Sequence, residues 1–152
     1  MTLAYEEGDV ARAAGQTKKG FSLRLTSATR QRLDQRARET GGQPTSLAER
    51  YIEEGLRRDD HPVVYFRDGA AGRRAAIIGS RLSVADVIAT MRQNDNSVEE
   101  TAFVLNLPPA KVEAAIRYYA DYQDEVDDWI ARTEEAAARA EEAFKRSQEV
   151  RA

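Results

Sequence analysis

The chain has 152 residues, of which 41% are hydrophobic and 32% charged, and it contains no cysteine. This hydrophobic content is sufficient for small packed cores and excludes a fully disordered chain. The absence of cysteine excludes disulfides and thiolate chemistry and fits a reducing compartment. No stretch approaches the roughly 18 apolar residues that a membrane span needs. Residues 1–15 also lack the basic and apolar regions of a signal peptide, so we expect a cytoplasmic protein with no membrane partner.

The net charge is −3, but the two signs are unevenly distributed along the chain. Residues 11–60 carry eleven Lys and Arg against seven Asp and Glu, whereas residues 61–125 carry seven against nine. Because phosphates attract cations and repel carboxylates, a nucleic acid would bind the first block. A basic segment followed by a mildly acidic one indicates two different partners.

The chain divides into four predicted segments, and the predicted fold class is mainly helical with a small β component. Residues 1–17 show no clear period and are predicted to be a flexible arm. Residues 18–60 are predicted to form one strand and two helices, and residues 61–122 a β-hairpin followed by three helices. Residues 123–152 are predicted to be a helical tail.

Residues 18–26 alternate apolar and polar side chains, which is the period of a strand with one apolar face. The apolar positions are Phe21, Leu23 and Leu25. Ser27 is predicted to cap a helix that ends at the pair Gly41 and Gly42, and a second helix is predicted to start at about Pro44. One strand and two helices cannot close a core. We therefore expect a homodimer in which two copies pair these strands across a two-fold axis.

Residues 18–60 resemble the ribbon-helix-helix family of repressors and antitoxins. The match lies in the sequence KKGFSLRLTS, in the turn at Gly41 and Gly42, and in the sequence PTSLA at the second helix. The resemblance implies that the paired strands enter the major groove of double-stranded operator DNA, where Ser22 and Arg24 contact bases. Gly20 has no side chain where the family often has a polar one, which limits base reading to these two residues.

The same resemblance implies contacts with the DNA phosphates. Lys18 and Lys19 are the expected partners on the strand, and Thr45 and Ser46 are those in the first turn of the second helix. Helix N-termini generally bind anions, which agrees with the second pair. The alternative is that residues 18–26 form an ordinary edge strand of a mixed sheet.

The next segment is predicted to begin with a hairpin of residues 62–66 and 73–78, joined by a turn at 67–72. Ser83 is predicted to start a helix that breaks at residues 94–96, and Ser97 with Glu100 forms a predicted capping box. Pro109 suits the first position of the last helix. The predicted inward residues are Val84, Val87, Ile88, Met91, Ala102, Phe103, Leu105, Val112, Ala115, Ile116 and Tyr119.

This order is winged-helix-like, and residues 73–125 resemble a domain of unknown function, DUF433, with a helix-turn-helix. The match lies in the sequences IIGSRLSVADVI, SVEETA and AAIRYYADY, with Ser80 where the family usually has Thr. The predicted recognition helix has only Lys111 and Arg117 as basic residues. Since phosphate binding depends on the number of cations, a protein-interaction or dimerisation role is favoured over DNA reading.

Residues 123–152 contain an apolar stripe with spacings of three and four, which predicts a C-terminal amphipathic helix. Two alternatives remain open for it. The helix packs on its own domain or on the dimer mate, for example as a coiled coil, or it lies in the groove of a toxin. In the second case the expected anchors are Trp129, Ile130 and Phe144. By analogy with antitoxins of PIN-type ribonucleases, Arg139, Lys145 and Arg146 would block the acidic site of the toxin.

No residue pattern indicates catalysis, a metal site or a cofactor. His61 is the only histidine and is interpreted as part of a solvated linker, and no Asp/Glu cluster has a calcium-loop spacing. The leading hypothesis is a non-enzymatic antitoxin of a type II toxin-antitoxin system. It would repress its own operon through the first module and neutralise a ribonuclease toxin through its C-terminal half. The alternatives are a free-standing transcriptional repressor without a toxin and a scaffolding protein whose ribbon only dimerises.

Overall fold

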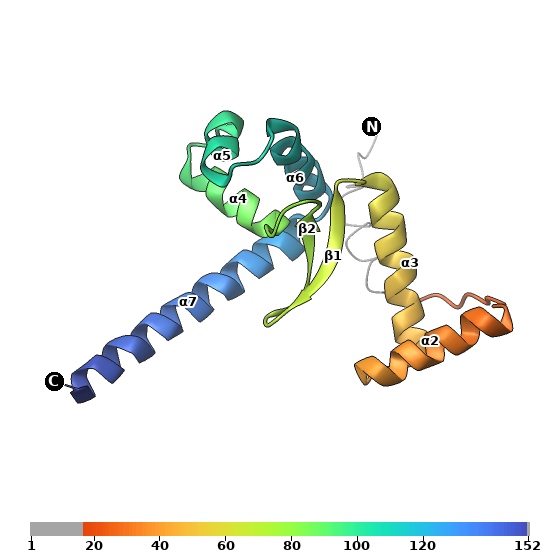
Figure 1. The fold of residues 1–152 in the computed structure, drawn as a ribbon. Helices are drawn as coiled ribbons and strands as arrows, with labels where there is room; N and C mark the ends of the chain where they lie inside the picture. The colour runs from red at the N-terminus through yellow and green to blue at the C-terminus, as the bar shows by residue number, and fades with distance from the viewer. Residues whose placement is uncertain (1–16, 152) are drawn as a thin grey trace, which may run out of the picture. The chain divides into compact units, whose positions relative to one another are not determined.

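The computed structural model describes residues 17–151, which form six helices and one two-stranded antiparallel sheet (Figure 1). Residue contacts divide the chain into two compact units that meet between Leu47 and Ala48. The predicted arm, residues 1–17, lies outside the described residues except for Thr17. The mainly helical class with a small β component is confirmed, whereas the ribbon-helix-helix and winged-helix arrangements remain predictions.

The first unit begins with residues 17–26, which form neither helix nor strand in the single chain. All ten residues are exposed, and the apolar side chains of the predicted strand are uncovered, with Phe21 82% exposed. A strand needs a hydrogen-bonding neighbour, and the expected neighbour belongs to a second copy. The ribbon therefore stays a prediction.

Helix α2 covers Ser27–Thr40, and its N-cap lies one residue before the predicted cap, Ser27. The cap is Thr26, whose side-chain oxygen accepts a hydrogen bond from the Thr29 amide at 3.2 Å. Both hydroxyl residues are competent caps, and Thr26 has the extended backbone that the cap position requires. The helix ends as predicted at Gly41, which has φ 67°, and the Gly42 amide donates to the carbonyl of Ala37.

Helix α3, Pro44–Asp60, starts at the predicted proline. Ala37 of α2 and Leu47 of α3 are the buried residues of the first unit. From Ala48 onward the helix counts with the second unit, so the boundary between units lies earlier than the predicted break after residue 60.

The hairpin consists of β1, Val64–Gly69, and β2, Gly72–Ile77. The pairing runs from Val64 opposite Ile77 to Gly69 opposite Gly72. Only Ala70 and Ala71 separate the two strands, so the predicted six-residue turn is wrong in length. Gly72 has φ 115°, a conformation that glycine adopts without steric cost and that lets the chain reverse in so few residues.

Three helices follow the hairpin in the predicted order: α4, Val84–Gln93, α5, Val98–Leu105, and α6, Pro109–Asp121. Ser83 caps α4 through a reciprocal capping box with Asp86, in which each side chain accepts from the other residue's amide. Ser97 accepts from the Glu100 amide at the start of α5. These helices and the hairpin enclose the core of the second unit, whose most buried members are Val64, Ile77, Val84, Val87, Ile88, Val112, Ala115 and Tyr118.

Phe103 was predicted to face inward, and this prediction is wrong because its side chain is 88% exposed. The buried residues of α5 are Thr101 and Ala102. Thr101 can be buried because its hydroxyl donates to the Ser97 carbonyl at 2.7 Å. A helix of two turns has one narrow inner face, and burying these two residues leaves Phe103 and Val104 outside.

Helix α7, Gln123–Arg151, has an inner end and an outer end. Val126 and Ile130 are buried in the core of the second unit, and Trp129 is half-buried. Every described residue from Ala131 onward is exposed. Figure 1 shows α7 running well beyond the other helices of its unit. None of the helices in residues 17–151 combines the length and hydropathy that crossing a bilayer requires.

Candidate nucleic-acid interface

The basic residues of the first unit are the strongest candidate for binding a polyanion. Residues 17–47 contain seven Lys and Arg but only two acids, Asp34 and Glu39. All seven basic residues are exposed. Arg30 lies 3.0 Å from Asp34 and Arg36 lies 3.6 Å from Glu39, so five positive charges remain in excess. Residues 48–152 carry 15 basic against 21 acidic residues, which leaves the first unit as the positive part of the chain.

The structure places the predicted DNA contacts in two exposed stretches of this unit. Lys18, Lys19, Ser22 and Arg24 all lie in the exposed segment that precedes α2. Because Ser22 and Arg24 alternate with the apolar residues of this segment, pairing the apolar side chains would turn both polar ones to the opposite face.

Thr45 and Ser46 lie exposed in the first turn of α3, as predicted. The Leu47 amide donates to the Gln43 carbonyl at 3.0 Å, so the amides of Thr45 and Ser46 precede the first bond of the helix. The first turn contains no acidic residue. This helix end has the donors and the dipole sign that a phosphate requires.

Helices α5 and α6, which the sequence predicts to form a helix-turn-helix, carry few basic residues. The Lys111 ammonium group donates to the Ile78 carbonyl at 2.7 Å, so this cation is engaged within its own domain. Arg117 is exposed on α6, beside the exposed acid Glu113. Since phosphate binding depends on the number of cations, the protein-interaction role of this unit stays a prediction.

His61 does not lie in a solvated linker, which corrects the prediction from the sequence. Its side chain is 9% exposed, and its Nε2 lies 2.8 Å from the Asp121 carboxylate. The rings of Tyr118 and Tyr122 contact it edge-on at centroid distances of 5.1 and 6.0 Å. His61 therefore packs the end of α3 against α6, which is a structural role. In residues 17–151 no group of three or more potential ligands could hold a metal ion.

Arg57 of α3 joins the same cluster and was not singled out by the sequence. Its Nη1 donates to the Tyr118 hydroxyl at 2.8 Å and to the Glu125 carboxylate at 2.7 Å. Its guanidinium also lies 4.0 Å from the centre of the Tyr122 ring. Burial raises the pKa of the Tyr118 hydroxyl, which therefore stays protonated and donates to Glu125.

These buried polar residues left only weak signals in the sequence. Tyr118 follows Val112 and Ala115 at spacings of three, which places it on the inner stripe of α6. Glu54 of α3 holds Arg73 of β2 through a two-pronged ion pair, whose second prong measures 2.7 Å. Nothing in the residues themselves links two positions so distant in the chain.

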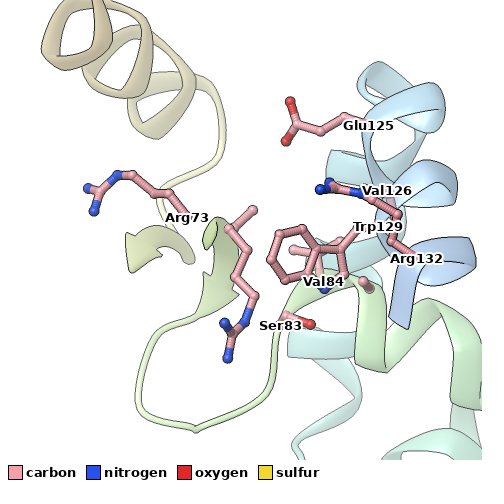
Figure 2. A pocket seen from close by; sticks show the side chains of 10 residues that line it. Arg73, Ser83, Val84, Glu125, Val126, Trp129 and Arg132 are labelled. Atoms are coloured by element: carbon pink, nitrogen blue, oxygen red, sulfur yellow. The ribbon is translucent and has the colours of Figure 1, made fainter. Parts of the chain in front are cut away.

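A small pocket of about 90 Å³ lies between β2, the start of α4 and the first turns of α7 (Figure 2). Figure 2 shows Trp129 reaching into it from α7, close to Ser83 and Val84. The guanidinium groups of Arg74 and Arg132 lie 5.6 and 5.1 Å from the Trp129 ring. The pocket is lined by the chain's own side chains and is too small for a ligand of ordinary size.

The six predicted toxin contacts divide into two groups. Trp129 packs into its own domain, and Ile130 is 8% exposed in its core, so neither offers a surface anchor. The other four, Arg139, Phe144, Lys145 and Arg146, lie on the exposed part of α7. Each basic side chain of this group approaches the glutamate four residues before it, at distances between 2.9 and 3.9 Å.

Comparison with known protein families, curated proteins and solved structures finds no match for this chain.

Proposed function

We propose that this protein is a dimeric DNA-binding repressor of the antitoxin type. Its first unit binds operator DNA, and its second unit binds a protein partner. The observation that carries the proposal is the exposed alternating segment of residues 17–26 within the basic unit. Phe21, Leu23 and Leu25 are 82%, 56% and 38% exposed, and no other part of the described single chain covers them.

Pairing with a second copy resolves this exposure. Uncovered apolar side chains at alternate positions cost about 25 cal/mol for each Å² that stays in water. A two-fold antiparallel ribbon buries all three on one face and satisfies the backbone donors and acceptors of both segments. The opposite face then carries two copies each of Ser22 and Arg24.

This ribbon would bind in the major groove, where Arg24 donates a bidentate pair to a guanine and Ser22 contacts a neighbouring base. The sequence-independent part of the affinity would come from Lys18 and Lys19 and from the α3 N-terminus at Thr45 and Ser46. The excess of positive charge in the first unit supports this assignment, because each phosphate contact releases a counterion.

The exposed outer part of α7 favours a protein partner for the second unit. A ribonuclease toxin of the PIN type, with an acidic active site, would accept the basic side chains Arg139, Lys145 and Arg146. The alternative, a free-standing repressor, would leave these residues without a partner protein. Deleting residues 131–152 and purifying the protein with the product of a neighbouring toxin-like gene distinguishes the two.

The decisive experiment replaces Arg24 by Ala in the full chain. Binding to the DNA upstream of its own reading frame is measured by fluorescence anisotropy at fixed salt. Loss of base reading should weaken operator binding by about 1–3 kcal/mol, or roughly 5- to 150-fold, and reduce discrimination against unrelated DNA. Arg38→Ala is the matched control, because Arg38 is an exposed cation of the same unit outside the ribbon.

Unchanged operator binding by Arg24→Ala would contradict the base-reading role. Failure of the natural chain to bind this DNA at all would contradict the repressor proposal as a whole. An equal loss in both variants would reduce the interface to nonspecific electrostatics.

A further inference from the structure

The outer part of α7 consists of a seven-residue repeat. From Arg132 the sequence reads RTEEAAA, RAEEAFK and RSQEVR, with arginine at the first position and glutamate at the fourth of each unit. Residues 131–151 are helical and exposed throughout. The repeat therefore lies on a part of α7 that is exposed along its whole length.

The repeat length has a physical meaning. A straight helix has about 3.6 residues per turn, so a strict seven-residue pattern drifts by about 20° per repeat around its axis. Such a pattern stays on one contact line only when two helices supercoil around each other with left-handed twist. Within a single helix, ion pairs such as Glu135–Arg139 and Glu142–Arg146 need only a spacing of four residues and no repeat of seven.

The repeat also defines one weakly apolar stripe. Its members are Thr133, Ala136, Ala137, Ala140, Ala143, Phe144, Ser147 and Val150. Phe144 and Val150 are 63% and 88% exposed. At spacings of three and four the stripe continues the face of Val126 and Ile130, which is buried in the second unit. The inner end of this face is covered, and the outer end is not.

The charges that border the stripe identify its partner. At 100° per residue, Arg132, Arg139 and Arg146 line one edge, and Glu134 and Glu141 line the other. Two parallel copies related by a two-fold axis along the helices place the arginine edge of each against the glutamate edge of the other. Antiparallel copies would place like charges together. The segment is therefore electrostatically complementary to itself only in the parallel orientation.

The contacts within α7 leave these arginines able to bind a second carboxylate. Arg139 lies 3.9 Å from Glu135, and its side chain is 74% exposed. Arg146 lies 3.7 Å from Glu142 and is similarly exposed. Arginine has five donors, so one carboxylate at this distance does not saturate it.

We propose that residues 132–151 pair with the same segment of a second copy as a parallel two-stranded coiled coil. The proposal does not depend on DNA binding. It assigns the stripe of the tail and the edge residues Arg139 and Arg146 to the second copy. Of the three basic residues proposed for a toxin, it leaves Lys145 on the outer face of the coil, seven residues after Ala138. A stripe that is mostly alanine is marginal by itself, so the pairing relies on the high local concentration within a dimer, and the full chain must be tested.

The chain has no cysteine, so single introduced cysteines report the pairing directly. Thr133→Cys and Ser147→Cys lie on the stripe, and Ala138→Cys lies on the outer face as a matched control. In a parallel coil each stripe residue faces its own copy within disulfide reach, so both stripe variants should form disulfide-linked dimers on mild oxidation. The control should react at least about tenfold more slowly.

Three outcomes overturn the proposal. Cross-linking only in a mixture of the Thr133→Cys and Ser147→Cys variants would show antiparallel pairing. Equal cross-linking of the control would show collision of unpaired tails. No cross-linking in either stripe variant, with the chain folded, would show that another partner or none covers the stripe.

A charge exchange tests the recognition rule separately. One variant carries Arg139→Glu and Arg146→Glu, and a second carries Glu134→Arg and Glu141→Arg. Each variant then has the same charge on the two edges of its stripe. Cross-linking through an added Ser147→Cys should therefore be weaker in each variant than in the natural background. Refolded together, the two variants should form mixed dimers in clear excess over the statistical half. A statistical mixture would refute the edge-to-edge pairing.

Discussion

Replacing Arg57 by Met removes the polar centre that joins α3 to α6 and α7 while keeping an unbranched stem as far as the position of Nε. Arg57 donates to the Tyr118 hydroxyl at 2.8 Å and to Glu125 at 2.7 Å, and its side chain is only 16% exposed. Methionine retains an apolar stem that can pack on Tyr122. The substitution therefore isolates the hydrogen bonds and the charge from the packing.

The expected loss is about 2–3 kcal/mol in the free energy of unfolding. A hydrogen bond to a charged group contributes about 1.5–3 kcal/mol, which applies to the one between Arg57 and the buried Tyr118. The Glu125 side chain is 49% exposed, so the ion pair with it is screened and contributes at most about 1 kcal/mol. The contact with the Tyr122 ring adds about 0.5–1 kcal/mol. The Met variant avoids the free-energy cost of burying the Arg57 charge, which offsets part of this sum.

The measurement is urea unfolding followed by circular dichroism at one fixed protein concentration, because the stability of a dimer depends on concentration. For a chain of this length the loss corresponds to a fall of about 5–10 °C in the melting temperature. Arg58→Met, on the exposed side of the same helix, should change stability by less than about 0.5 kcal/mol. Equal midpoints for the two variants would refute the reasoning.

Three further predictions concern single side chains, and each is checked by the same unfolding measurement. Gly41→Ala should cost about 1–2 kcal/mol, because φ is 67° and a Cβ meets nothing within 4 Å, so only backbone strain contributes; no loss would contradict this. Hydrogen bonds from Arg92 and Tyr119 hold the pKa of Asp127 below its ordinary value, so its contribution is present above about pH 4 and is lost as the pH falls through the lowered pKa. Asp127→Asn should therefore flatten the acid limb of the stability curve, and an unchanged limb would exclude this role. Phe103→Ser should change stability by less than about 0.5 kcal/mol, and a loss typical of a core residue would contradict its exposure.

The ends of the helices were largely predictable from the sequence because their signals are local. Gly41 ends α2, Ser83 caps α4 and Pro109 opens α6, each within a few residues of the backbone groups that it affects. The exception is the cap of α2, where both Thr26 and Ser27 have a hydroxyl that can accept the capping hydrogen bond. The backbone conformation at Thr26 decides which of the two is the cap, and the sequence does not specify that conformation.

The inward face of short elements was less predictable. Phe103 fits an apolar pattern on α5, yet the packing of α5 turns Thr101 and Ala102 inward. A helix of two turns contains too few residues for its period to define a face. Which residues are covered then depends on the neighbouring helices rather than on hydrophobicity.

The candidate DNA-binding residues followed from the alternation of residues 18–26 and from the basic block, and both are properties of the sequence. The seven-residue repeat of the tail is equally visible there, because period and charge order need no coordinates. Only the tertiary structure decided that Ile130 is buried in the core of the second unit, whereas Phe144 is exposed on the same helix. Only it decided, too, that His61 is buried against Asp121. Burial depends on contacts between residues distant in the chain, and a local pattern carries no information about them.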